Sequence, residues 1–90
     1  MTSRTERIRS SLAATFTPVA LEVVDDSARH EGHAGAAPGG GTHYNVRLVS
    51  PHFAGMNRVA RSRAVHEALK AEFDAGLHAL SLDLKAPGEA

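Results

Sequence analysis

The sequence of 90 residues contains no cysteine and no tryptophan, and only 4 % of its residues are aromatic. Without cysteine the chain cannot form a disulfide, and any metal site must use nitrogen or oxygen ligands unless another molecule supplies sulfur. The N-terminal segment lacks the apolar core of a signal peptide, and no apolar run approaches the roughly 18 residues of a membrane span. We therefore expect a soluble, cytoplasmic protein without membrane contact.

The chain also has no net charge, because ten Lys and Arg residues balance ten Asp and Glu residues. Non-specific nucleic-acid binding depends on many cations that neutralise phosphates, so only a local basic surface remains available for it. Signatures of catalysis are missing as well, since the sequence has neither a GxxxxGK[ST] phosphate loop nor a serine nucleophile elbow. A chain this short has little room for a deep cavity, so we expect one domain over 1–90 that is not an enzyme.

Hydrophobic periodicity predicts the secondary structure. The first helix follows a capping box and repeats apolar residues at helical spacing, and the strands alternate apolar and polar residues. Six elements are expected: helix 4–16, strand 19–25, strand 42–50, a short turn or helical piece 52–56, helix 57–74 and strand 77–84. The buried side of the second helix is predicted to contain Val65, Ala68, Leu69 and Phe73.

The order of these elements predicts the wiring of the sheet. The first two strands should be antiparallel, whereas a helical crossover should make the second and third parallel. The expected fold is α+β, a three-stranded mixed sheet with helices packed on one face. The last strand then begins at the edge of the sheet where the second begins, beside the glycine-rich segment 27–41. We expect that segment to be a mobile loop and residues 86–90 to be a frayed tail.

Histidine is the strongest ligand chemistry that the chain offers. His30 and His33 lie in segment 27–41, His43 follows it, and His78 opens the last strand. The expected topology brings His78 to the rim nearest His30 and His33, with its side chain on the core-facing side of the strand. Desolvation would hold such a histidine neutral, so that its free ring nitrogen could bind a metal.

Two other interpretations of these histidines stay open. A single histidine at the edge of a core more often bonds to the backbone than to a metal. Alternatively, His30, His33 and His78 could bind a zinc or nickel ion directly. The His30-x-x-His33 spacing is a weak zinc signal, because structural zinc sites use four close Cys or His ligands.

Four ordered segments resemble the BolA family across nearly the whole chain: LEVVDDSARHEGHAG, GTHYNVRLVS with a following FAG, RVARSRAVHEAL, and GLHALSLDLKAP. The resemblance implies a class II KH-like αββααβ domain, which agrees with the expected order of elements. It also implies partnership with a monothiol glutaredoxin and shared coordination of a [2Fe-2S] cluster. The implied function is that of a non-enzymatic adaptor of iron–sulfur metabolism.

The same resemblance implies roles for the histidines. His78 matches the C-terminal ligand of the family, and the second ligand comes from the loop, where His30 fits the motif slightly better than His33. His43 matches a position adjacent to the site. Because this chain lacks thiolates, the glutaredoxin cysteine and glutathione would supply the sulfur ligands. The isolated chain is expected to hold no cofactor and to be a monomer or a weak homodimer.

An alternative that the resemblance implies is a DNA-binding transcriptional regulator, in which Arg58, Arg61 and Arg63 approach phosphates. We favour a solvated helix face for these arginines, because there is no GxxG clamp and few aromatic residues for base stacking. An acidic or glutathione-bearing partner surface is another expected contact for them. The helix departs from the family at Ser62, where histidine is usual, and at His66, where tyrosine is common.

Overall fold

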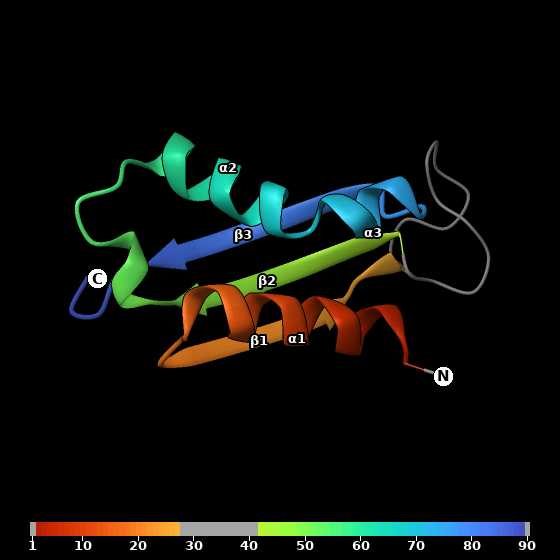
Figure 1. Cartoon of the computed structure of the whole chain (residues 1–90), viewed down its shortest axis with the longest axis horizontal. Coiled ribbons are helices and arrows are strands. Elements are labelled where there is room, and N and C mark those ends of the chain that lie inside the picture. Colours follow the sequence, from red (N-terminus) through yellow and green to blue (C-terminus); the bar gives the residue numbers. More distant parts are fainter. Residues whose placement is uncertain (1, 28–41, 90) are drawn as a thin grey trace.

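The computed structural model describes residues 2–27 and 42–89. Three strands form one sheet in the order β1-β2-β3, with β1 antiparallel and β3 parallel to β2. The helices cover one face of this sheet (Figure 1). The elements are α1 (Arg4–Phe16), β1 (Ala20–Asp25), β2 (His43–Val49), the 3₁₀ turn η2 (Pro51–Phe53), α2 (Arg58–Ala68), α3 (Lys70–Asp74) and β3 (Ala79–Lys85). The expected α+β fold and strand directions are confirmed.

Local signals explain the bounds of α1. The hydroxyl of Ser3 accepts a hydrogen bond of 3.1 Å from the Glu6 amide, which satisfies one of the unpaired amides of the first turn. At the other end Thr17 adopts a left-handed conformation with φ 45°, and Pro18 follows. A left-handed residue followed by proline ends a helix efficiently, so α1 occupies the range that the sequence predicts.

The long helix expected over 57–74 is instead two helices that meet at Leu69. The backbone of Leu69 has φ −105° and ψ 14°, outside the helical range, while its side chain is 1 % exposed. Leu69 is therefore buried, as expected, at the junction where α2 ends and α3 begins. Glu72 of α3 then faces α1, where Arg4 and Arg7 hold its carboxylate.

The hydrophobic core lies between the sheet and the helices. In β2 the side chains alternate as expected, so Tyr44, Val46 and Leu48 are buried. The remaining buried hydrophobic residues are Ile8, Leu12, Phe16, Val23, Phe53, Val65, Leu69, Leu77 and Ala86. No helix in the described ranges is long and apolar enough to cross a membrane.

Residues 86–89, for which the sequence predicts a frayed tail, form a turn against the domain. The Glu89 amide donates to the Ala86 carbonyl at 3.2 Å, and a carboxylate oxygen of Glu89 accepts from the Ala86 amide at 2.9 Å. This turn brings the Glu89 carboxylate against Arg61 of α2.

Candidate functional site

The candidate site lies at the rim of the sheet where β2 and β3 begin. His43 is aligned with Ala79 across these two parallel strands, so both starts share one edge. Asp25, the last residue of β1, is aligned with Tyr44, which puts the end of β1 at the same rim (Figure 1). The prediction that the last strand begins where the second begins is therefore confirmed.

His78 lies at this rim but is exposed, so the prediction of a core-facing side chain is wrong. The amides of His78 and Ala79 both donate to the Thr42 carbonyl, at 2.9 and 3.0 Å. Two residues thus share one acceptor, which interrupts the strand alternation before Ala79. Leu77 is instead the buried residue, with 4 % of its surface exposed. The ring of His78 consequently lacks the burial that was expected to desolvate it.

The structure brings His78 and His43 together. Their ring centroids are 5.3 Å apart and their planes are inclined by 51°. Metal–nitrogen bonds are about 2 Å long, so two rings at this separation are close enough for both to reach one ion. His30 and His33 lie outside the described residues. Within 2–27 and 42–89, no cluster of three or more His, Cys, Asp or Glu side chains could hold a metal ion.

The ring of His43 is oriented by its neighbour. Its Nδ1 lies 2.9 Å from the Thr42 hydroxyl, a hydrogen bond whose direction depends on the histidine tautomer. His78 differs, since its ring makes no hydrogen bond to any other described residue, and its one ring–ring contact within those residues is with His43. The rim therefore contains two different imidazoles. The ring of His43 is oriented by a hydrogen bond, whereas the nitrogen atoms of His78 have no hydrogen-bond partner among the described residues.

Ser27 holds the base of this rim, a role that the sequence analysis missed. Its side chain is buried, and its hydroxyl oxygen accepts hydrogen bonds from the amides of Thr42 (2.9 Å) and His43 (3.1 Å). The Ser27 amide donates in turn to a carboxylate oxygen of Asp25 at 2.9 Å. An aspartate two residues before a serine at the end of a strand is typical of an Asx turn, and this signal was available in the sequence.

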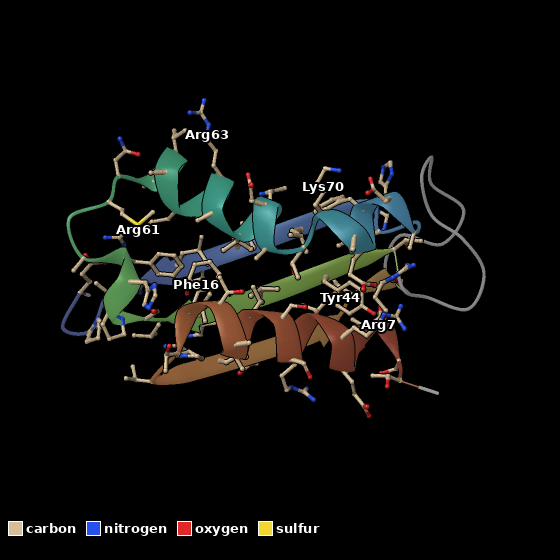
Figure 2. All side chains as sticks on the ribbon, in the orientation of Figure 1. Arg7, Phe16, Tyr44, Arg61, Arg63 and Lys70 are labelled. Carbon is tan, nitrogen blue, oxygen red and sulfur yellow. The ribbon has the colours of Figure 1, made fainter. Side chains whose placement is uncertain are left out.

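The three arginines proposed for nucleic-acid contact have different environments. The side chain of Arg61 is only 11 % exposed and pairs through both terminal nitrogen atoms with Glu89, at 2.6 and 2.8 Å. This pairing lowers the pKa of Glu89 to about 2. Arg58 and Arg63 are exposed and make no ion pair within the described chain. Figure 2 shows Arg63 projecting outward from α2.

Arg61 also supports the backbone around it. Its Nε donates to the Met56 carbonyl at 2.9 Å, and one terminal nitrogen donates to the Leu84 carbonyl at 3.2 Å. The guanidinium carbon lies 5.8 Å from the centroid of the Phe53 ring. With these contacts Arg61 links α2 to β3 and to the C-terminal turn. Its charge is compensated within the domain by Glu89.

A comparison with known protein families shows the family to which this chain belongs. The family model for BolA-like protein matches residues 12–89. The chain belongs to the BolA family. Among solved structures, the BolA domain of SufE1 from Arabidopsis thaliana covers all of this chain with a TM-score of 0.89 and 43 % identity, and 99 % of that domain is matched. The solution structure of mouse BolA1 matches with a TM-score of 0.77 and 33 % identity, over 97 % of this chain and 68 % of the mouse chain.

Curated relatives place the chain within the family in the same way. A Sinorhizobium protein from the 5′ region of cobS is 51 % identical over 97 % of this chain and 95 % of its own length. Chloroplastic BOLA1 of Arabidopsis thaliana is 45 % identical over 97 % of this chain, which spans 56 % of that relative. The DNA-binding transcriptional regulator BolA of Escherichia coli is 43 % identical over 86 % of this chain and 70 % of its own length.

Proposed function

We propose that this BolA-family chain is a non-enzymatic adaptor of iron–sulfur metabolism, which pairs with a monothiol glutaredoxin and supplies His78 to a shared [2Fe-2S] cluster. The observation that carries the proposal is the exposed His78 ring, 5.3 Å from His43 and without a hydrogen bond to any described residue. Only buried polar groups require partners within the protein, so the nitrogen atoms of this exposed ring are available to an external ligand. An exposed imidazole at a rim is accessible to a group presented by another protein.

The donor chemistry fits a shared cluster better than a cluster held by this chain alone. The chain has no cysteine, so the thiolates that iron–sulfur clusters require must come from the partner and from glutathione. Imidazole can replace thiolate on one iron, and this replacement raises the reduction potential of the cluster. His78 is the described residue best placed for that role, and His30 or His33 is the proposed second ligand. His43, held by Thr42, is proposed to limit the positions of the His78 ring.

Visible circular dichroism of a cluster-loaded monothiol glutaredoxin tests the proposal. Addition of this chain should change the spectrum, because one thiolate ligand of the cluster is replaced by imidazole. His78→Ala should abolish the change, and the loss caused by His30→Ala or His33→Ala should identify the second ligand. His52→Ala is the matched control, since His52 is also exposed but lies in η2, at the opposite end of β2. A spectrum unaffected by the wild-type chain, or equally affected by His78→Ala, would contradict the proposal.

DNA binding is the second candidate, and it is favoured by one observation. Arg58 and Arg63 are exposed at the start of α2 and make no ion pair with the described residues. The Escherichia coli relative is named a DNA-binding transcriptional regulator. The candidate predicts a salt-sensitive mobility shift of DNA that Arg58→Ala and Arg63→Ala weaken. An absence of binding at low salt would dismiss it, whereas Arg61→Ala is uninformative because Arg61 supports the fold.

A further inference from the structure

A groove of about 650 Å³ lies between the first half of α2 and the second half of β3. Its walls combine apolar and charged side chains, and the basic ones outnumber the acidic ones Asp83 and Glu89. Leu82 and Leu84 contribute from β3, while Arg58, Val59 and Arg63 contribute from α2. Val59 is 58 % exposed, so an apolar side chain faces solvent between two cations. This surface is at the opposite end of β3 from His78, which precedes the first residue of the strand.

One wall of the groove is the free edge of β3. Within the described ranges β3 pairs only with β2, so its other edge has no strand beside it. The Ala79 amide and the Lys85 carbonyl both bond toward β2, and backbone groups alternate along a strand. The amides and carbonyls of Leu80, Leu82 and Leu84 therefore point away from β2, and of these groups the Leu84 carbonyl already accepts a hydrogen bond from Arg61. An edge that exposes backbone groups in this way is a template for an added strand.

The charge of the groove favours an acidic ligand. Arg61 is neutralised by Glu89, and Asp83 lies 3.9 Å from Lys85 and 4.0 Å from Arg47. Arg58 and Arg63 form no ion pair with any described residue. They therefore leave uncompensated positive charge in the groove.

The chain itself already holds one carboxylate in the groove. Both oxygen atoms of Glu89 accept from Arg61, and one also accepts from the Ala86 amide. The same chemistry is available to acidic side chains of another protein at Arg58 and Arg63.

We propose that this groove binds an extended acidic segment of a partner protein, which adds as a fourth strand to the free edge of β3. The backbone of the segment bonds to Leu82, and the acidic side chains on its α2-facing side pair with Arg58 and Arg63 and cover Val59 with their methylene groups. Strand addition provides affinity through the main chain, and the two arginines select for acidic sequences.

Two other occupants fit the groove less well. Single-stranded nucleic acid binds through stacking on aromatic side chains, and no Phe, Tyr or Trp lines the groove. A second copy of this chain would bring Arg58 and Arg63 of both copies toward each other, and like charges at such an interface are unfavourable. The proposal does not depend on the iron–sulfur function, because its residues do not include the histidines at the other end of the strand.

A labelled synthetic peptide in which glutamate alternates with valine is the direct probe, with fluorescence anisotropy as the measurement. Binding by the full chain should be detectable at low salt and should weaken as salt rises. A lysine–valine peptide of the same length should not bind. An acidic peptide with proline in place of each valine should bind roughly tenfold or more weakly, because proline cannot donate the backbone hydrogen bonds of an added strand.

Variants of the chain distinguish specific binding in the groove from a general effect of the total charge of the protein. Arg63→Glu should weaken binding of the glutamate–valine peptide by roughly tenfold or more. Arg9→Glu is the matched control, since Arg9 is an exposed helical arginine on α1 that makes no ion pair with the described residues. In hydrogen exchange the amide of Leu82 should become protected when the peptide binds, whereas that of Ser81, which points toward β2, should change little.

Several results would overturn the proposal. Equal weakening by Arg63→Glu and Arg9→Glu would show that only the total charge matters, and unchanged exchange at Leu82 would exclude strand addition. Stronger binding of a single-stranded oligonucleotide than of the acidic peptide would assign the groove to nucleic acid. A dimer in analytical ultracentrifugation that Arg63→Glu strengthens would assign it to a second copy of the chain.

Discussion

Arg7 in α1 and Glu72 in α3 form a two-point ion pair across 65 residues of sequence. The Nε of Arg7 lies 3.0 Å from Oε2 of Glu72, and its Nη2 lies 3.0 Å from Oε1. Arg4 adds a third contact through its Nε, 3.2 Å from Oε1. Since the Glu72 side chain is only 12 % exposed, two cations compensate one largely buried carboxylate. This contact joins the first helix to the last one.

Replacement of Glu72 by glutamine should therefore destabilise the domain. The substitution keeps the shape of the side chain but removes the charge that Arg4 and Arg7 neutralise. Hydrogen bonds to charged groups contribute about 1.5–3 kcal/mol each, and we expect a loss of stability of about this size. Urea unfolding followed by far-ultraviolet circular dichroism measures it. Glu67→Gln on exposed α2 is the control, and an equal loss for both variants would contradict a specific role for Glu72.

Stability should fall when the pH is lowered into the acidic range. The hydrogen bond from Arg7 lowers the pKa of Glu72 below its ordinary value of 4.5, and Arg61 lowers the pKa of Glu89 to about 2. A depressed carboxyl pKa in the folded state stabilises the protein above the unfolded value near 4.5, and this contribution disappears as the pH falls toward the folded value. Unfolding midpoints at about pH 7 and pH 3 should show the decrease.

A double variant identifies which carboxyl groups cause that pH dependence. Glu72→Gln combined with Glu89→Gln should be less stable than the wild type at neutral pH but should lose less stability on acidification. If the double variant keeps the full wild-type dependence between about pH 5 and pH 2, other carboxyl groups are responsible.

The fold was predictable because its signals are local. The capping box at Ser3 and the repeat of Ile8, Leu12 and Phe16 predict α1 with its observed bounds. The strand directions follow from the order of elements, since a helical crossover leads to a parallel strand. These signals need only neighbouring residues and general rules of chain connection.

The features that differ from the prediction depend on contacts between segments far apart in the sequence. The exposure of His78 follows from the Thr42 carbonyl, which accepts from two successive amides, and no sequence pattern near His78 reveals this acceptor. The burial of Arg61 depends in the same way on Glu89, which lies 28 residues further along the chain. The parallel direction of β2 and β3 indicates that His43 and His78 lie at the same edge of the sheet. How close they are depends on the register, in which His43 is aligned with Ala79, and the sequence does not reveal that register.

Ser27→Ala should loosen the rim where the histidines lie. The Ser27 hydroxyl accepts from the Thr42 and His43 amides in a buried position, and its removal leaves both amides without this acceptor. An unsatisfied buried polar group costs about 1–3 kcal/mol. Hydrogen exchange at Thr42 and His43 should accelerate, and the urea midpoint should fall. Ser81→Ala at an exposed position is the control, and unchanged exchange at both amides would show that Ser27 does not hold the rim.

His78→Ala should leave the stability of the isolated chain within about 0.5 kcal/mol of the wild type. The side chain of His78 is exposed and makes no hydrogen bond to the described residues, so the substitution removes little burial and no such bond. Leu77→Ala is the contrasting variant, because Leu77 is 4 % exposed and its truncation should cost about 2–5 kcal/mol. Urea unfolding of the three proteins makes the comparison. A large destabilisation by His78→Ala would indicate a structural role, and a loss of the cluster signal in that variant could then no longer be attributed to a missing ligand.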